Sequence, residues 1–308
     1  MSHPPPVRIR RTFRKPGDPG SSGCHSARVT AALRTRLETY YDMVPRAASD
    51  VEEHGPLTLF VARGGWPYYA RPRLDGTPGR DGTGQITADD VRAVLARQRE
   101  LGVPRALEWV HETTPTLFSA ARAAGMRVEE CPLLVLGGEP TTRSRDLGGS
   151  DVDVHVITAD DPELRLVRAA IAVGFGHAGT GVGEASVEAS VQERDAEAAA
   201  DPDAAARTAA QIAAGRSVLV GAVDPQAGPV GGGSHNPRDG VTEIVGVGVI
   251  PAFRRRGIAG AVAAALARDA LGSGVGTVFC GAQDEDVARI YRSVGFHRVG
   301  TACIAEAD

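Results

Sequence analysis

Runs of apolar residues separated by turn-forming residues predict a first set of strands and helices in the N-terminal half of the chain. The expected elements are strands over 57–62, 106–110 and 128–136 and helices over 86–101 and 115–124. The first helix opens with Thr87 and Asp90 at the spacing of a capping box, and it stops at Gly102. Alternation of this kind is typical of an α/β unit.

A second set of elements follows a polar linker over 137–150. Its expected elements are strands over 152–158, 217–223, 241–250, 277–280 and 299–305 and helices over 162–173, 185–214, 257–271 and 286–294. The pair Asp201-Pro202 breaks the long Ala-rich helix, because proline lacks the N–H that a helix interior needs. The three glycines at 231–233 have no helix after them, so we interpret them as a flexible hairpin loop.

The two sets repeat one order of elements: helix, strand, helix, glycine, strand. A shift of 170 residues, from Gly125 to Gly295, also places the helix stop at Leu101-Gly102 on Leu271-Gly272. We therefore predict two copies of one α/β fold with a mixed sheet, over residues 31–140 and 150–308.

Composition narrows the function classes. A formal net charge of -4 gives no strong electrostatic case for a nucleic-acid or membrane partner. No apolar run is long enough to span a bilayer, and no apolar segment typical of a signal peptide follows the N-terminal arginines. Residues 1–30, rich in Pro, Gly, Ser and Arg, are predicted to be a disordered basic tail. The four cysteines show no CxxC spacing, which argues against a metal site and favours a cytoplasmic location.

One connection between a strand and a helix has the composition of an anion site. A β-branched strand ends at Pro251, and a helix of small apolar residues begins near Gly257. The first N–H groups of a helix have no partner within it, and the positive end of the helix dipole lies beside them. Gly257 lacks a Cβ that would block close approach, and the arginines at 254–256 add positive charge suited to a phosphate group.

This connection resembles motif A of the GNAT superfamily, whose pattern is V-x-P-x-x-[RQ]-x-x-G-x-[GA]. The matching residues are Val249, Pro251, Arg254, Gly257 and Ala259. A second segment, 284–296, is similar to GNAT motif B through Tyr291, Gly295 and Phe296, with Asp284 where the family usually has Asn. The resemblance implies two tandem GNAT-like folds, the second of them catalytic.

The resemblance also implies an N-acetyltransferase that moves the acetyl group of acetyl-CoA to an amine by direct attack, without a covalent enzyme intermediate. It implies that the following residues hold acetyl-CoA: Val247, Val249, Arg254, Arg255, Arg256, Gly257, Ile258 and Ala259. A backbone N–H near Val247 would polarise the thioester carbonyl, and Gly246 and Gly248 would allow the bulge that exposes it.

Two side chains are candidates for proton transfer. In the family, the tyrosine that corresponds to Tyr291 protonates the departing CoA thiolate; the alternative is a packed tyrosine with an idle hydroxyl group. Glu243 lies in a strand where some GNAT enzymes carry a glutamate, and it is the candidate base, directly or through water. The alternative for Glu243 is a strand residue exposed to solvent.

Other expectations concern the first copy and the acceptor. Asp89 and Asp90 at a helix N-terminus would repel a pyrophosphate, so we expect one acetyl-CoA site per chain. Trp66, Tyr68 and Tyr69 either wall an acceptor pocket or pack within a hairpin. The acceptor would be an amine on a small molecule, a peptide or a protein. A CoA-binding sensor without catalysis and an enzyme similar to mycothiol synthase, also a tandem GNAT protein, remain alternatives.

Overall fold

The computed structural model describes residues 20–64, 67–77, 79, 85–141, 151–177, 179–183 and 185–307. The helices are α1 (Gly20–Arg46), α2 (Ala88–Leu101), α3 (Thr116–Ala123), α4 (Leu164–Gly176), α5 (Val187–Ala200), α6 (Asp203–Ala213), α7 (Ile258–Gly272) and α8 (Glu285–Val294), with a 3-10 turn η1 (Pro251–Phe253). The strands are β1 (Ser49–His54), β2 (Leu57–Ala62), β3 (Ala70–Pro72), β4 (Ala106–Val110), β5 (Arg127–Leu136), β6 (Asp153–Ile157), β7 (Val218–Asp224), β8 (Gly228–His235), β9 (Val241–Val249), β10 (Thr277–Gly281) and β11 (Phe296–Glu306).

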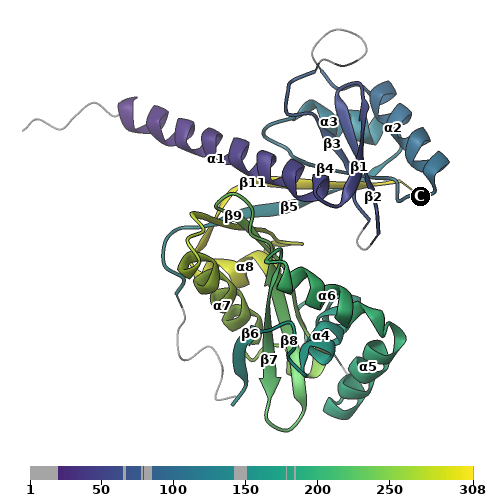
Figure 1. Cartoon of the computed structure of the whole chain (residues 1–308). Coiled ribbons are helices and arrows are strands. Elements are labelled where there is room, and N and C mark those ends of the chain that lie inside the picture. The colour runs from purple at the N-terminus through teal and green to yellow at the C-terminus, as the bar shows by residue number, and fades with distance from the viewer. Residues whose placement is uncertain are drawn as a thin grey trace, which may run out of the picture.

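Within these ranges, the eleven strands form one mixed sheet. Their order is β1-β2-β3-β4-β11-β5-β10-β9-β8-β7-β6. The pairs β3–β4 and β9–β10 are parallel and the other neighbouring pairs are antiparallel. Figure 1 shows the first unit above the second, with α1 crossing over the strands that join them. The predicted α/β class with a mixed sheet is confirmed.

The internal repeat is visible in the elements. The series α2-β4-α3-β5 in the first unit corresponds to α7-β10-α8-β11 in the second. In the centre of the sheet, the last strand of each unit lies beside the other unit: β11 pairs with β4, and β5 pairs with β10. The long antiparallel pair β5–β11 joins the two copies. The two units therefore share the middle of the sheet.

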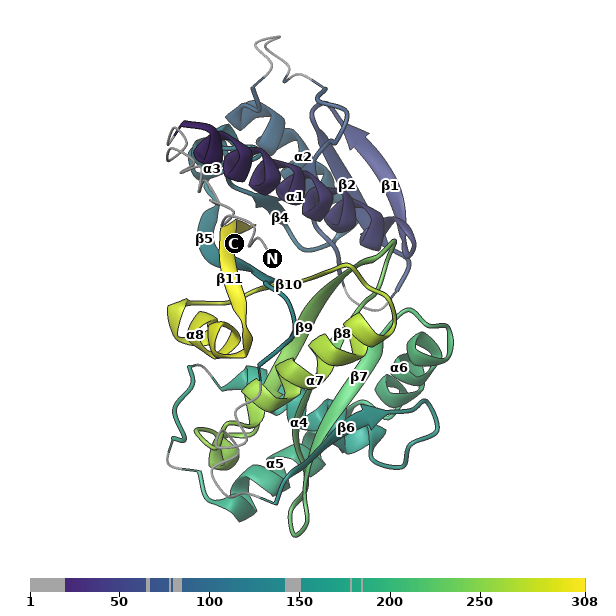
Figure 2. The ribbon, with the colours of Figure 1, turned by 90° about the vertical axis from the view of Figure 1, so that its left-hand side faces the viewer.

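The long helix α1 was not predicted from the sequence, and neither was β1. The predicted tail over 1–30 is corrected at its end, because α1 begins at Gly20; residues 1–19 lie outside the described residues. Leu37 and Tyr40 of α1 pack in one apolar cluster with Val110, Val135 and Phe279. These partners come from β4, β5 and β10, so α1 covers strands of both units (Figure 2).

The interpretation of the glycines at 231–233 as a hairpin loop is wrong, because they form the middle of β8. Helices α4 and α7 press on this strand from opposite sides. A Cβ on Gly232 would lie 2.9 Å from Val167 of α4, and one on Gly233 would lie 3.1 Å from Leu266 of α7. The glycines are needed for close packing and not for a turn.

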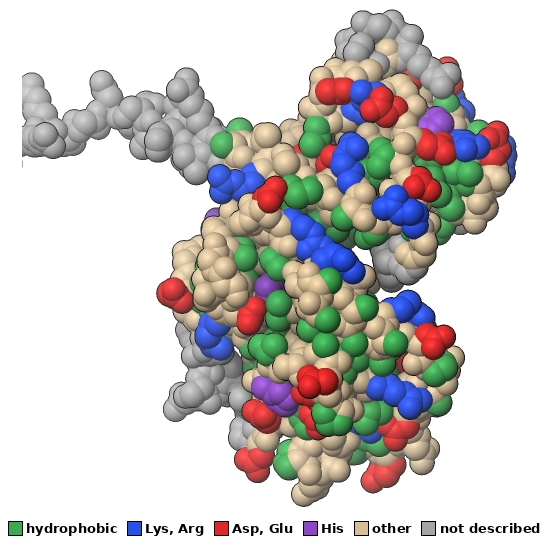
Figure 3. All heavy atoms as spheres, in the orientation of Figure 1, with side chains coloured by type: hydrophobic (Ala, Val, Ile, Leu, Met, Phe, Trp, Pro, Cys, Tyr) green, Lys and Arg blue, Asp and Glu red, His purple; other side chains and the backbone are tan. Residues whose placement is uncertain are grey.

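The helix ends follow the predicted signals closely. Thr87 and Asp90 form the predicted capping box at the start of α2, and Gly102 ends this helix with a left-handed φ of 66°. The break at Asp201-Pro202 separates α5 from α6. Acidic and basic side chains are intermixed over both units on the face seen in Figure 3. In the part of the chain that the structure describes, no helix is long and apolar enough to cross a membrane.

Candidate active site

The central parallel pair of the second unit opens into a cleft. Strands β9 and β10 pair only at their first residues, with Glu243 opposite Phe279 as the last partners. Beyond this point β9 stays with β8, whereas β10 continues beside β5. The separation leaves an opening that belongs to a cleft of about 2230 Å³. Glu243 therefore lies where the two strands diverge.

A bulge marks the open part of β9. The register between β8 and β9 shifts after the pair Ser234–Val245, and it resumes at Gly232–Gly248. Two residues, Gly246 and Val247, thus face the single residue Gly233, and Gly246 has a positive φ of 66°. A bulge leaves one residue outside the strand ladder. The expected bulge is present, and Val247 lies in the wall of the cleft.

The turn between β9 and α7 forms one end of the cleft. Arg255 and Gly257 both have left-handed backbone angles, with φ of 62° and 79°. Gly257 is the N-cap residue of α7, and no side chain caps this helix among the described residues. Gly257 and Gly260 line the cleft, so the first turn of α7 is accessible from it. An uncapped helix N-terminus behind glycine is suited to bind phosphate oxygens.

The three arginines of the turn have different surroundings. Arg254 lines the cleft, but its guanidinium donates to the carbonyl oxygens of Gly174 and His177, both at 2.8 Å, and to that of Val249 at 3.1 Å. Arg256 lies over the ring of Phe253, 4.5 Å from its centroid. Arg255 lines the cleft. The side chain of Arg254 thus fastens the turn to α4.

The remaining cofactor candidates divide into two groups. Val247 and Val249 line the cleft, as expected. Ile258 is buried in the apolar core behind the turn, and Ala259 packs against that core. Ile258 and Ala259 therefore can contribute backbone N–H groups but present no side chain to the cleft.

Tyr291 is held at the cleft by a well-formed helix. Asp284 caps α8 by accepting a hydrogen bond from the Val287 N–H at 2.8 Å, so the aspartate replaces the usual asparagine without loss of the cap. The Tyr291 ring packs edge-on against Phe296 with centroids 5.6 Å apart. Burial raises the pKa of Tyr291 well above its ordinary value. Its hydroxyl group is therefore protonated at neutral pH.

Glu243 is half-buried in the cleft and is held by two tyrosines of α1. The Tyr41 hydroxyl donates to Glu243 Oε1 at 2.9 Å. The Tyr40 hydroxyl accepts the Glu243 N–H at 3.2 Å and donates to the carbonyl of Asn236 at 2.7 Å. Burial raises the pKa of Glu243 to about 7, and the bond from Tyr41 opposes this rise. A carboxylate with a pKa near neutrality is well matched to a general base.

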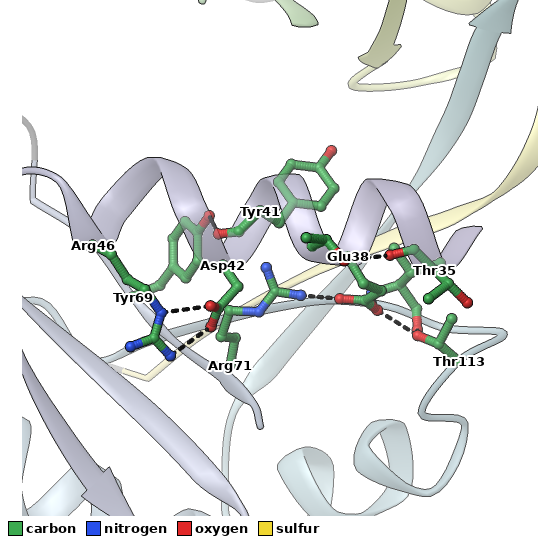
Figure 4. Close-up of polar contacts among 10 residues, drawn as sticks. Thr35, Glu38, Tyr41, Asp42, Arg46, Tyr69, Arg71 and Thr113 are labelled. Atoms are coloured by element: carbon green, nitrogen blue, oxygen red, sulfur yellow. Dashed lines mark hydrogen bonds and ion pairs between the residues drawn. The ribbon is translucent and has the colours of Figure 1, made fainter. Parts of the chain in front are cut away.

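Helix α1 is itself anchored in the first unit, as the close-up in Figure 4 shows. Glu38 accepts hydrogen bonds from Arg71 of β3 and from Thr113, and Arg71 is fully buried. Burial lowers the pKa of Arg71 to about 9. Tyr69 also donates to the Tyr41 carbonyl at 3.4 Å. The first unit therefore positions the tyrosines that contact Glu243.

Sequence reasoning missed the role of Tyr40 and Tyr41. Four of the five tyrosines in the sequence line the cleft, and the fifth is Tyr40. In a chain with 5% aromatic residues, two consecutive tyrosines are conspicuous and could have indicated a site. Tyr68 and Tyr69 line the same cleft, whereas Trp66 lies outside the described residues.

Part of the chain matches the model of a known protein family. The model of the acetyltransferase (GNAT) family matches residues 189–296, which begin within α5 and end at the first residue of β11. Residues 189–296 therefore form a GNAT acetyltransferase domain, and the resemblance found in the sequence is confirmed for this part of the chain.

Solved structures show that the fold of this chain occurs in other proteins. A GCN5-related N-acetyltransferase from Kribbella flavida has a TM-score of 0.62 at 19% identity, covering 89% of this chain and 95% of its own. A GCN5-related N-acetyltransferase-like protein from Streptococcus suis has a TM-score of 0.47 at 12% identity, with coverages of 89% and 98%. A tandem GNAT protein from the clavulanic acid biosynthesis pathway has a TM-score of 0.47 at 15% identity, covering 82% of this chain and 78% of its own. No curated protein matches the sequence.

Proposed function

We propose that the protein is an N-acetyltransferase that moves the acetyl group of acetyl-CoA to an amine by direct attack. The observation that carries the proposal is the separation of β9 from β10 beside an uncapped glycine turn. The turn is suited to the pyrophosphate of CoA, and the open strand edge can pair with its amide-containing arm. The candidate acid and base both line the cleft that continues from this turn.

Glu243 would prepare the acceptor. An ammonium group has no lone pair, so it must lose a proton before its nitrogen can attack the thioester carbonyl carbon. A carboxylate with a pKa of about 7 is ionised often enough at neutral pH to take this proton. The bulge at Val247 would present a backbone N–H to the carbonyl oxygen as negative charge develops on it.

Tyr291 would serve the leaving group. When the C–S bond breaks, the electron pair goes to sulfur, and the phenol proton can pass to that thiolate. The burial that raises the pKa of Tyr291 would also raise the pKa of a thiol formed beside it, so proton transfer between the two groups stays feasible. The attacking nitrogen and the carbonyl carbon form the new amide bond, and no covalent enzyme intermediate is needed.

The test is a titration of the full chain with acetyl-CoA by calorimetry, followed by release of free CoA thiol with a panel of amines. We expect one acetyl-CoA site per chain. Tyr291→Phe should keep acetyl-CoA binding and lower kcat by about 10²-fold or more. Two equivalent sites would contradict the single site, and unchanged turnover in Tyr291→Phe would remove its role as acid. Binding without turnover of any amine would favour a sensor.

A further inference from the structure

The cleft does not end at Glu243 but continues into the first unit. The same cavity that reaches the α7 turn is lined farther along by Tyr69, Glu108, Cys131 and Ile304. Tyr69 directly precedes β3, and the other three residues belong to β4, β5 and β11. An acceptor that reaches Glu243 through this part of the cleft would therefore contact the first unit.

Strand register places Glu108 on the wall of this part of the cleft. Glu108 of β4 is opposite Ile304 of β11, which in turn is opposite Glu129 of β5. Side chains of directly opposed residues lie on the same face of a sheet. Glu108, Ile304 and Glu129 thus form a row on one face, and all three line the cleft.

Glu108 differs from the neighbouring carboxylates in lacking a cationic partner. Arg127 forms ion pairs with both Glu129 and Glu306. Glu108 is half-buried, and within the described ranges it makes no ion pair or hydrogen bond to a side chain. The nearby buried cation, Arg71, donates its hydrogen bond to Glu38, and its charge acts on Glu108 without a hydrogen bond between them.

The charge balance around Glu108 calls for a cation. Burial and the charge of Glu243 raise the pKa of Glu108 to about 8, and Glu306 adds to this rise, while Arg71 opposes it. Because the charge of Glu243 opposes ionisation of Glu108, positive charge beside Glu108 would favour the state in which both carboxyl groups are ionised. Tyr41 and Tyr69 lie next to the pair, and aromatic ring faces also attract ammonium groups.

We infer that Glu108 determines acceptor specificity, and that the acceptor is a primary amine carrying a second positive charge, which Glu108 binds while the reacting nitrogen lies at Glu243. The inference rests on the proposed function, because it takes Glu243 to be the base that receives the reacting nitrogen. One carboxylate is sufficient for a monoamine. The second, on a strand of the other unit, is placed in the same cleft to bind a second cation of the same ligand. The first unit then supplies half of the acceptor site.

The test measures amine binding by calorimetry to the full chain loaded with CoA, which does not depend on turnover. The probes are 1,4-diaminobutane and 1,6-diaminohexane, each compared with the monoamine of the same carbon number. We expect the better diamine to bind at least tenfold more tightly than its monoamine, because a charged hydrogen bond contributes about tenfold to a hundredfold.

Glu108→Gln keeps the shape of the side chain and removes its charge, so it should weaken diamine binding at least tenfold more than monoamine binding and abolish the preference for the diamine. Glu130→Gln is the matched control, because Glu130 is an exposed carboxylate of neighbouring β5 outside the cleft lining; it should retain the preference. Equal binding of diamine and monoamine by the unmodified chain, or a preference that survives in Glu108→Gln, would overturn the inference.

Turnover separates this inference from the proposed function. If the diamine binds selectively through Glu108 but no CoA thiol is released from acetyl-CoA, the acceptor site stands and the transferase activity fails. If monoamines and diamines are acetylated with equal kcat/KM, the transferase activity stands and the role of Glu108 fails.

Discussion

Tyr40 and Tyr41 are consecutive residues of α1, yet they bind different parts of the same glutamate. Tyr41 contacts the Glu243 carboxylate and Tyr40 contacts its backbone N–H. Consecutive helical residues point about 100° apart, so both contacts are possible only because α1 lies close along β9. The candidate base thus has a side-chain position fixed by a residue 202 positions away in the sequence.

Replacement of Tyr41 by Phe should change the pH dependence of the reaction. The Tyr41 hydroxyl lowers the pKa of Glu243, which burial raises to about 7. Since the base must be ionised, kcat/KM should rise with pH through that pKa and level off above it. In Tyr41→Phe the rise should move to higher pH, with roughly twofold to tenfold less activity at pH 7 and recovery near pH 9.

A control is available on the same helix. Thr39→Val removes an exposed hydroxyl group that, among the described residues, bonds to the carbonyl of Thr35, so its pH profile should match that of the unmodified chain. A pH profile of Tyr41→Phe with an unchanged midpoint would show that the Tyr41 contact does not tune the base.

At the scale of single residues, the sequence indicated some site residues and missed others for a physical reason. Tyr291 and Glu243 were identified through short local patterns, and both lie at one cleft. Tyr41 and Glu108 belong to no local pattern. Their positions at the cleft come from contacts between segments far apart in the chain, which no short window of the sequence contains.

At the scale of elements, the α7 turn depends on a side chain that the family pattern associates with the cofactor. Arg254 donates to carbonyl oxygens near the end of α4 and in β9. Arg254→Ala should therefore lower the free energy of unfolding by about 1–3 kcal/mol, as well as weaken acetyl-CoA binding by loosening the turn. Thermal unfolding with and without acetyl-CoA measures both effects.

Arg289, which forms an exposed ion pair with Asp286, provides a control for the Arg254 variant. Arg289→Ala should change stability by less than about 0.5 kcal/mol and leave acetyl-CoA binding intact. If Arg254→Ala were equally neutral for stability but abolished binding, Arg254 would act directly on the ligand.

The close packing around the glycines of β8 leads to a separate prediction about stability. A Cβ at Gly232 would lie 2.5 Å from the Val220 carbonyl oxygen, a backbone atom that cannot move away without breaking the β7–β8 pair. Gly232→Ala should therefore destabilise the protein by about 1–3 kcal/mol or more. Gly272→Ala, at the open end of α7 with nothing within 4 Å, should be neutral or slightly stabilising. Denaturant unfolding of the two variants tests this contrast.

Strand β8 also shows why a loop was wrongly predicted at residues 231–233. Helix starts and stops were predictable at Thr87, Gly102 and Gly295, because caps are local features with residue-specific chemistry. Three consecutive glycines normally indicate a loop, since glycine weakens a strand interior. Here the preference is overridden by α4 and α7, whose positions depend on tertiary packing.

At the scale of the whole molecule, the sequence predicted the repeat but not how its copies interlock. The match of helix and strand positions at a shift of 170 residues corresponds to the series α2-β4-α3-β5 and α7-β10-α8-β11. Such a match gives the order of elements within each copy. It does not say that β11 lies between β4 and β5, because sheet neighbours are set by pairing between the copies.

Interlocking predicts that the two halves do not separate. Cleavage between residues 141 and 151 should leave both fragments in one particle, because β11 is paired with β4 and β5 over most of its length. Size-exclusion chromatography and circular dichroism of the cleaved protein should match those of the intact chain. Residues 20–141 alone should be largely unfolded, whereas a stable, monomeric fragment would show that the first unit needs no strand from the second.

The place of β11 also governs when the first unit can form. This strand follows every other element in the chain, yet it fills the gap between β4 and β5. Domains of a nascent chain usually fold in order as they leave the ribosome. Here the first unit keeps an open sheet edge until β11 has been made and has left the exit tunnel. Completion of the cleft therefore depends on a strand far from the first unit in the sequence, and it should be slow and sensitive to chaperones.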